Sequence, residues 1–118
     1  MLKVTWIKST ADSWLKLETF NLESCDVNPG VYIIWHAGNP SRVVYVGQGD
    51  IKARLGLHRN DKEITAYNKQ GTLYVTWAAV PARSLDGVER YLADYWKPLV
   101  GDRHPNVAPI EVNSPFAA

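Results

Sequence analysis

The sequence predicts a small fold of mixed α and β structure, in which a mostly antiparallel sheet of three strands is flanked by helices. Two β-branched and aromatic runs, separated by the turn residues 37–41, predict a β-hairpin. A third run of this kind covers residues 72–80, and apolar residues at helical spacing begin at Leu85. With 118 residues, of which 46% are hydrophobic, the chain is long enough to bury a core, and we expect one domain over residues 1–118.

The N-terminal segment mixes the periods of strand and helix. Residues 3–7 are expected to form a short strand. Ser9 or Thr10 is expected to cap a helix that continues to about Lys16. The inward positions of that helix would be Trp14, Leu15 and Leu17. The stretch Asn-Pro-Gly at 28–30 then interrupts regular structure.

The hairpin is followed directly by a helix. Residues 31–36 form its first predicted strand and residues 42–46 its second, which ends at the glycine-rich stretch 47–49. Asp50 is a suitable N-cap for the helix that follows. This helix carries Ile51, Leu55 and His58.

The second half of the chain predicts a short helix at 62–69, the third strand at 72–80 and a longer helix capped by Ser84. The inward positions of the longer helix would be Leu85, Val88, Leu92 and Tyr95. It ends before Pro98, and residues 102–118 are expected to be extended coil.

Composition excludes several classes of protein. The net charge is +1, from 13 Lys and Arg against 12 Asp and Glu, so the chain lacks the basic balance of a dedicated DNA binder. A single cysteine, Cys25, excludes an internal disulfide and a four-cysteine zinc site, and it suits a reducing, cytoplasmic compartment. Because no apolar stretch reaches the ~18 residues of a membrane helix and no signal peptide begins the chain, we expect an intracellular protein without a membrane partner.

Five residues together suggest phosphodiester chemistry. Tyr32 and Tyr45 lie on the hairpin, Arg54 and His58 are four residues apart on one helix face, and Glu89 lies in the last helix. Singly, each has an ordinary explanation as a core tyrosine or a solvated surface charge. Together they offer a proton relay, a guanidinium for phosphate oxygens and a carboxylate for Mg²⁺.

These residues resemble the motifs of the GIY-YIG nuclease superfamily. The half-motifs are GVY at 30–32 and YVG at 45–47, with valine in place of isoleucine in both, and Arg54, His58 and Glu89 follow. The similar region extends from about residue 29 to 106. The resemblance implies a hydrolase with this fold, a Mg²⁺-dependent endonuclease that cuts DNA by water attack with one metal ion, for which Mn²⁺ can substitute.

The resemblance also implies a role for each residue. Tyr32 would activate or orient the attacking water, and Tyr45 would line the site and hold water or phosphate. Arg54 would stabilise the phosphate in the transition state. His58 would act as a base or phosphate contact, and Glu89 would be the metal ligand.

Further residues are expected around this site. A late asparagine would brace it, with Asn106 as the candidate and Asn113 as the competitor. His36 and His104 are not expected to bind metal, although His104 is near Asn106 in the tail, from where it can approach the site. Two glycines that let the backbone turn beside the site and three cations near Arg54 form the expected nucleic-acid-binding set: Gly47, Gly49, Lys52, Arg59 and Lys62.

Other functions remain open at this point. The same fold can serve as a non-catalytic module that binds nucleic acid or protein, or the tyrosines can simply fill a core. For the nuclease, the expected partner is duplex or structured DNA, helped by a homodimer or a targeting partner because the charge is near neutral. The choice between DNA and RNA, the specificity and the pathway are not determined by the sequence.

Overall fold

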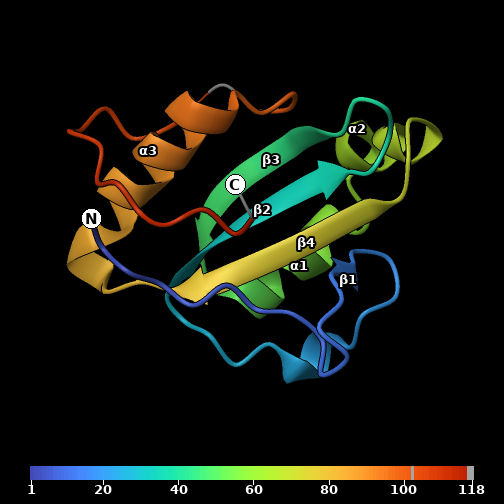
Figure 1. The fold of residues 1–118 in the computed structure, drawn as a ribbon, viewed down its shortest axis with the longest axis horizontal. Coiled ribbons are helices and arrows are strands. Elements are labelled where there is room, and N and C mark those ends of the chain that lie inside the picture. The colour runs from blue at the N-terminus through green and yellow to red at the C-terminus, as the bar shows by residue number, and fades with distance from the viewer. Residues whose placement is uncertain (102, 117–118) are drawn as a thin grey trace.

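An antiparallel sheet of four strands forms the centre of the molecule (Figure 1). The structure is a computed structural model that describes residues 1–101 and 103–116. The elements, in chain order, are β1 (Leu15–Lys16), η1 (Leu22–Ser24), β2 (Gly30–His36), β3 (Arg42–Gly49), α1 (Ile51–His58), α2 (Lys62–Thr65), η2 (Ala66–Lys69), β4 (Leu73–Ala79), η3 (Ala82–Ser84) and α3 (Leu85–Trp96). The strand order is β1-β4-β2-β3, and each neighbouring pair is antiparallel.

The predicted hairpin is confirmed, but its second strand is longer than expected. Gly30 pairs with Gly49 and Tyr32 with Gly47, so β3 continues through the glycine-rich stretch that was predicted to end it. Gly47 can stay in the strand because it lies under the Tyr32 ring. A Cβ at position 47 would lie 2.3 Å from Tyr32 Oη, so only glycine leaves room for that ring.

The sheet has a fourth strand where the sequence predicted a helix. Leu15 and Lys16 pair with Val75 and Tyr74 at the edge of β4, so the expected helix between Ser9 and Lys16 is wrong. Leu15 and Leu17 contact the same core, whereas Lys16 between them is exposed. This is the period of a strand, and pairing with β4 outweighs the weak local preference for helix.

The expected strand at residues 3–7 is also wrong. The segment is extended, but its contacts are single ones: Ile7 N–H donates to the Trp77 carbonyl, and the neighbouring Leu2 forms an isolated parallel bridge to Val112. The segment therefore lies along the sheet without joining it as a strand.

Helices cover both faces of the sheet (Figure 1). Ile51 and Leu55 of α1 and Ile64 of α2 pack on one face, together with Tyr32 and Trp77. On the other face, α3 packs against residues of β2 and β3, and residues from both chain ends join this second core. The buried residues of α3 are Gly87, Val88, Glu89, Leu92 and Ala93.

Most of the remaining elements agree with the sequence. The helix at 62–69 is present as α2 followed by η2, and β4 and α3 lie where they were expected. Tyr95 is an exception, because its side chain is 62% exposed instead of inward-facing. Described residues 103–116 are coil apart from the Val112 bridge, and positions 102 and 117–118 of the predicted tail lie outside the described residues. Within the described part of the chain, no helix is long and apolar enough to cross a membrane.

Candidate active site

The β2–β3 hairpin places Tyr32 and Tyr45 on the same face of the sheet. Tyr32 is opposite Gly47, and Tyr45, two residues before Gly47 on β3, is opposite Ile34. Residues two apart on a strand point to the same side. The two tyrosine rings are stacked, with centroids 6.1 Å apart and planes inclined by 13°.

Helix α1 brings His58 to these tyrosines. The Asp50 side chain caps the helix by accepting a hydrogen bond from Ala53 N–H, and buried Ile51 and Leu55 hold it against the sheet. His58 Nε2 then lies 2.7 Å from Tyr32 Oη, and its ring centroid is 4.5 Å from that of Tyr45. Three side chains from two strands and one helix are thus in direct contact.

Burial sets the protonation states of this cluster. Tyr32 is fully buried, which raises the pKa of its hydroxyl, and nearby Arg54 opposes that rise. Burial, with the charge of Arg54 second, lowers the pKa of His58 to about 4. Near neutral pH the contact therefore joins a neutral tyrosine to a neutral imidazole.

Arg54 lies on the open side of the cluster. Its proximity to the Tyr32 hydroxyl, and then to Tyr45, raises the pKa of Arg54, so it keeps its charge. Arg54 is exposed and Tyr45 is half-buried, whereas Tyr32 and His58 are buried. Arg54 and Tyr45 are therefore the members of the cluster that solvent can reach.

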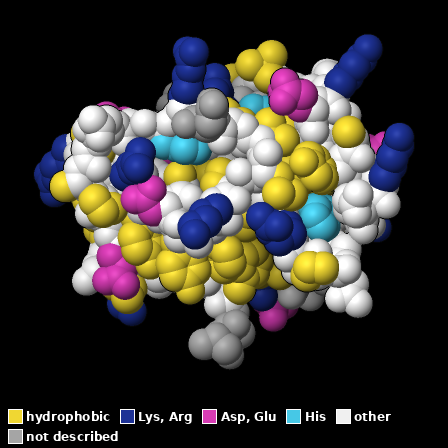
Figure 2. All heavy atoms as spheres, turned by 90° about the horizontal axis from the view of Figure 1, so that it is seen from above, with side chains coloured by type: hydrophobic (Ala, Val, Ile, Leu, Met, Phe, Trp, Pro, Cys, Tyr) yellow, Lys and Arg dark blue, Asp and Glu magenta, His cyan; other side chains and the backbone are white. Residues whose placement is uncertain are grey.

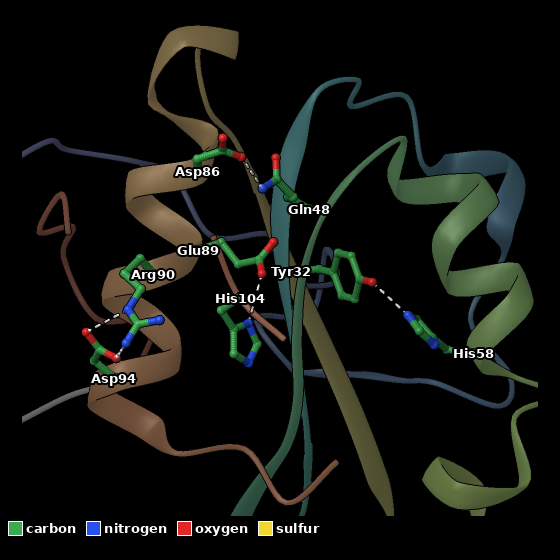
Figure 3. A network of polar contacts seen from close by, with 8 residues as sticks. All are labelled: Tyr32, Gln48, His58, Asp86, Glu89, Arg90, Asp94 and His104. Carbon is green, nitrogen blue, oxygen red and sulfur yellow. Dashed lines mark hydrogen bonds and ion pairs between the residues drawn. The ribbon is translucent and has the colours of Figure 1, made fainter. Parts of the chain in front are cut away.

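Glu89 comes from α3 and is paired with His104 (Figure 3). His104 Nδ1 and Glu89 Oε2 are 2.8 Å apart, and the Glu89 residue is only 7% exposed. Gln48 Nε2 donates to Asp86 Oδ1 at 2.8 Å, which fixes α3 against β3. Asp86 and Glu89 are three residues apart, so they share a face of the helix.

The segment after α3 connects the two groups of residues. Leu99 and Val100 donate backbone hydrogen bonds to the Val43 and Val44 carbonyls along the free edge of β3. Gly101 then lies beside Tyr45, so close that a Cβ would be 3.1 Å from the tyrosine Cε2 atom. The Glu89 carboxylate is near enough to Tyr32 for its charge to contribute to the raised pKa of that hydroxyl.

The acidic side of the site offers few protein ligands to a metal ion. Among the described residues, no group of three or more His, Cys, Asp or Glu side chains is arranged to hold a metal. Mg²⁺ often uses one or two carboxylates, with water and phosphate oxygens as its other ligands. The bond to His104 occupies Glu89 Oε2, and a monodentate ligand needs only the other oxygen.

The two candidate asparagines have different environments. Asn106 is exposed in the tail. Asn113 accepts a hydrogen bond from Val4 N–H and donates one to the Val4 carbonyl, at 2.8 and 3.0 Å. Asn113 therefore holds the two chain ends together.

Two of the three expected DNA-binding cations are engaged within the protein. Lys52 pairs with Glu23 at 2.8 Å, and Arg59 donates to the Leu17 and Phe20 carbonyls. Lys62 is exposed on α2. Gly49 adopts a φ of +123° beside Arg54, a conformation that favours glycine, so it shapes the backbone where β3 leads into α1.

Sequence reasoning missed the supporting roles of Gln48, Asp86 and Gly101, and it missed the partner of His104. The Gln48–Asp86 bond and the contact of Gly101 with Tyr45 join positions that are distant in the sequence. His104 was expected in the tail near Asn106, within reach of the site, and its partner in the structure is Glu89. A histidine in a coil gives no local signal of its partner.

Comparisons with protein-family models, curated proteins and solved structures give no match to this chain. The assignment of this site therefore depends on its own residues and their geometry. Tyr32, Tyr45, Arg54 and His58 form one cluster, and Glu89 with His104 lies within electrostatic reach of it.

Proposed function

We propose that this protein is a Mg²⁺-dependent endonuclease of the GIY-YIG kind, which hydrolyses phosphodiester bonds in DNA. The observation that carries the proposal is the 2.7 Å contact between Tyr32 Oη and His58 Nε2, with Tyr45 packed against both rings. Tyr32 and His58 are both named by the resemblance, and they are 26 positions apart in the sequence. A chance sequence match would not require them to meet.

His58 and Tyr32 form the proton acceptor in this proposal. Because the pKa of His58 is about 4, its imidazole is neutral at physiological pH and can accept a proton. The Tyr32 hydroxyl would pass its proton to His58 Nε2 while taking one from the attacking water. The water oxygen forms the new bond to phosphorus, and the bond to the leaving oxygen breaks.

Arg54 and Tyr45 are the residues that first meet the DNA phosphate. Arg54 is exposed and charged, and its guanidinium can donate paired hydrogen bonds to phosphate oxygens. Tyr32 is fully buried, and Arg54 is close to its hydroxyl on the exposed side of the cluster.

Glu89 would hold the metal ion, with His104 fixing the direction of its carboxylate. Once bound, Mg²⁺ would act as a Lewis acid that stabilises charge on the leaving oxygen. The Gln48–Asp86 bond keeps this part of α3 against β3.

A plasmid-nicking assay with Mg²⁺ or Mn²⁺ tests the proposal. Glu89→Gln keeps the shape of the side chain but removes the charge that binds metal, so nicking should fall by roughly a hundredfold or more. Glu111→Gln, at an exposed carboxylate in the C-terminal coil, serves as the matched control and should leave nicking unchanged. A Glu89→Gln variant as active as the wild type would refute the assigned metal ligand.

The choice of substrate separates the nuclease from a binding module. Wild-type protein should cleave at least one member of a panel of duplex, branched and single-stranded DNA. Binding without cleavage across the whole panel would favour a non-catalytic nucleic-acid-binding module on the same fold. No cleavage and no binding would leave the tyrosines as core residues.

A further inference from the structure

An aromatic cavity lies on the other face of the sheet from Tyr32 and His58. Its volume is about 500 Å³. Three tryptophans and a phenylalanine form most of its lining, and these are Trp14, Trp35, Trp96 and Phe116. Neither the site described above nor the proposed chemistry uses these residues.

The aromatic rings are arranged as walls at right angles. Phe116 meets Trp35 edge to face at 82° and Trp96 at 87°, and Trp14 meets Trp35 at 89°. Trp35 is buried, whereas the other three aromatic residues are half-buried. Trp35 therefore forms the floor, and the remaining rings offer partly exposed surfaces on which a flat aromatic group can stack.

The mouth of the cavity is positively charged. Arg42 and Ser41, both exposed, line it at the start of β3. Lys8 Nζ lies 4.4 Å from the Trp14 ring centroid, although it also pairs at 3.6 Å with the highly exposed Asp12. No acidic residue is part of the described lining. Figure 2 shows hydrophobic side chains gathered on one face of the molecule with Lys and Arg side chains beside them.

We propose that this cavity binds one nucleotide, with the base stacked among Trp14, Trp96 and Phe116 and its phosphate held by Arg42. An aromatic wall accepts any base, because every base has a π-face. The guanidinium selects an anionic ligand and disfavours a cation, which aromatic cavities otherwise attract. The nucleotide can be free or part of a single strand, since both present the same base and phosphate.

The location of the cavity relates it to the candidate active site. Val43 lines the cavity, and Tyr45 lies two residues further along β3. The segment that follows Trp96 runs along this edge of β3 and reaches Tyr45 at Gly101. A nucleotide in the cavity would thus lie at the sheet edge that leads to the site, but its binding does not require cleavage.

Binding is measured in EDTA, which prevents metal-dependent cleavage, by quenching of tryptophan fluorescence. The probes are deoxyadenosine monophosphate, deoxyadenosine, inorganic phosphate and a ten-nucleotide oligothymidine. Arg42→Ala should weaken binding of the monophosphate by about tenfold but leave that of the nucleoside unchanged. Trp96→Leu should weaken binding of both by about tenfold, because it removes a stacking surface.

Arg83→Ala is the matched control, since Arg83 is exposed in η3, which precedes the N-terminal end of α3, whereas Trp96 is the last residue of that helix, which is about 18 Å long. It should bind like the wild type, and circular dichroism should show that every variant is folded.

Tighter binding of the oligonucleotide than of the monophosphate would assign the site to a single strand, and equal binding would assign it to a free nucleotide. The proposal is wrong if neither deoxyadenosine monophosphate nor the oligothymidine gives saturable binding. It is also wrong if a tryptophan-containing peptide binds and the nucleotides do not, or if Arg42→Ala binds the monophosphate like the wild type. None of these results depends on whether the protein cuts DNA.

Discussion

Tyr32 is the residue on which the candidate site depends most. Its ring occupies the space that Gly47 leaves open, and its hydroxyl contacts His58. It is also the residue that links the second strand of the sheet to the first helix. Changes at this residue and at its partner therefore test the site most directly.

Replacing Tyr32 with phenylalanine should remove the proton relay and keep the ring. His58 Nε2 then loses its partner in a buried place, which costs about 1–3 kcal/mol of folding free energy. Nicking should fall by roughly a hundredfold. Tyr67→Phe, at a half-buried tyrosine that stacks on His36, is the control and should retain full activity. If Tyr32→Phe nicks DNA at the wild-type rate, the hydroxyl has no part in catalysis.

The pH dependence of stability should reveal His58. Its pKa is lowered from 6.5 to about 4 in the folded protein, so between these values the unfolded chain binds the extra proton. The contribution of His58 to the free energy of unfolding is therefore fully present above pH 6.5, and it decreases as the pH falls towards 4. The loss is on the order of 3 kcal/mol, since each pKa unit is worth about 1.4 kcal/mol.

Urea unfolding at several pH values measures how the free energy of unfolding changes with pH. His58→Gln cannot titrate, so its stability should change less between pH 6.5 and 4 than that of the wild type. Equal slopes for the two proteins would show that His58 keeps an ordinary pKa.

At the scale of elements, the hairpin and α1 act as one unit. The hairpin needs a glycine opposite Tyr32, and α1 needs its buried face to bring His58 into contact. Two glycines with opposite requirements lie in these elements. Gly47 has no room for a side chain, whereas Gly56 in α1 meets only Leu22 Cδ1, at 3.8 Å from an added Cβ.

The two glycine-to-alanine variants should therefore change stability in opposite directions. Gly47→Ala pushes Tyr32 from its position and should cost about 1–3 kcal/mol, with loss of nicking. Gly56→Ala should stabilise the protein by about 0.5–1 kcal/mol, because alanine favours the helix and fits the available space. Thermal unfolding of both proteins provides the comparison, and a stabilised Gly47→Ala variant would contradict the close packing of Tyr32 on β3.

At the scale of the whole molecule, the two ends of the chain complete the second core. Leu2, Val4 and Trp6 from one end and Ile110 and Phe116 from the other pack against the same face of the sheet. Asn113 joins these ends through both backbone groups of Val4, and its own carbonyl accepts a hydrogen bond from Trp6 Nε1. The ends therefore contribute to global stability.

Asn113→Ala should lower the free energy of unfolding by about 1–3 kcal/mol, because it leaves both Val4 backbone groups without partners. Asn106→Ala should change it by less than about 0.5 kcal/mol, since Asn106 is exposed. Urea unfolding distinguishes the two variants. Equal losses would mean that Asn113 does not hold the chain ends together.

Local patterns in the sequence were sufficient to predict the hairpin, α1, β4 and α3. Each has a clear period, and each begins or ends at a residue with a defined backbone preference, such as Asp50. The same patterns placed Tyr32, Tyr45, Arg54 and His58 on the elements that hold them. Interactions between residues close in the sequence thus determined the central strands and helices and the candidate residues of the site.

Only the tertiary structure decided the remaining features, because they depend on contacts between distant residues. Residues 15–16 become a strand by pairing with β4, and Gly47 remains in β3 because Tyr32 lies above it. Burial against the sheet lowers the pKa of His58, and the position of Glu89 beside His104 depends on the path of the chain after α3. The sequence by itself therefore determined which groups are available for chemistry, and long-range packing decided which of them meet.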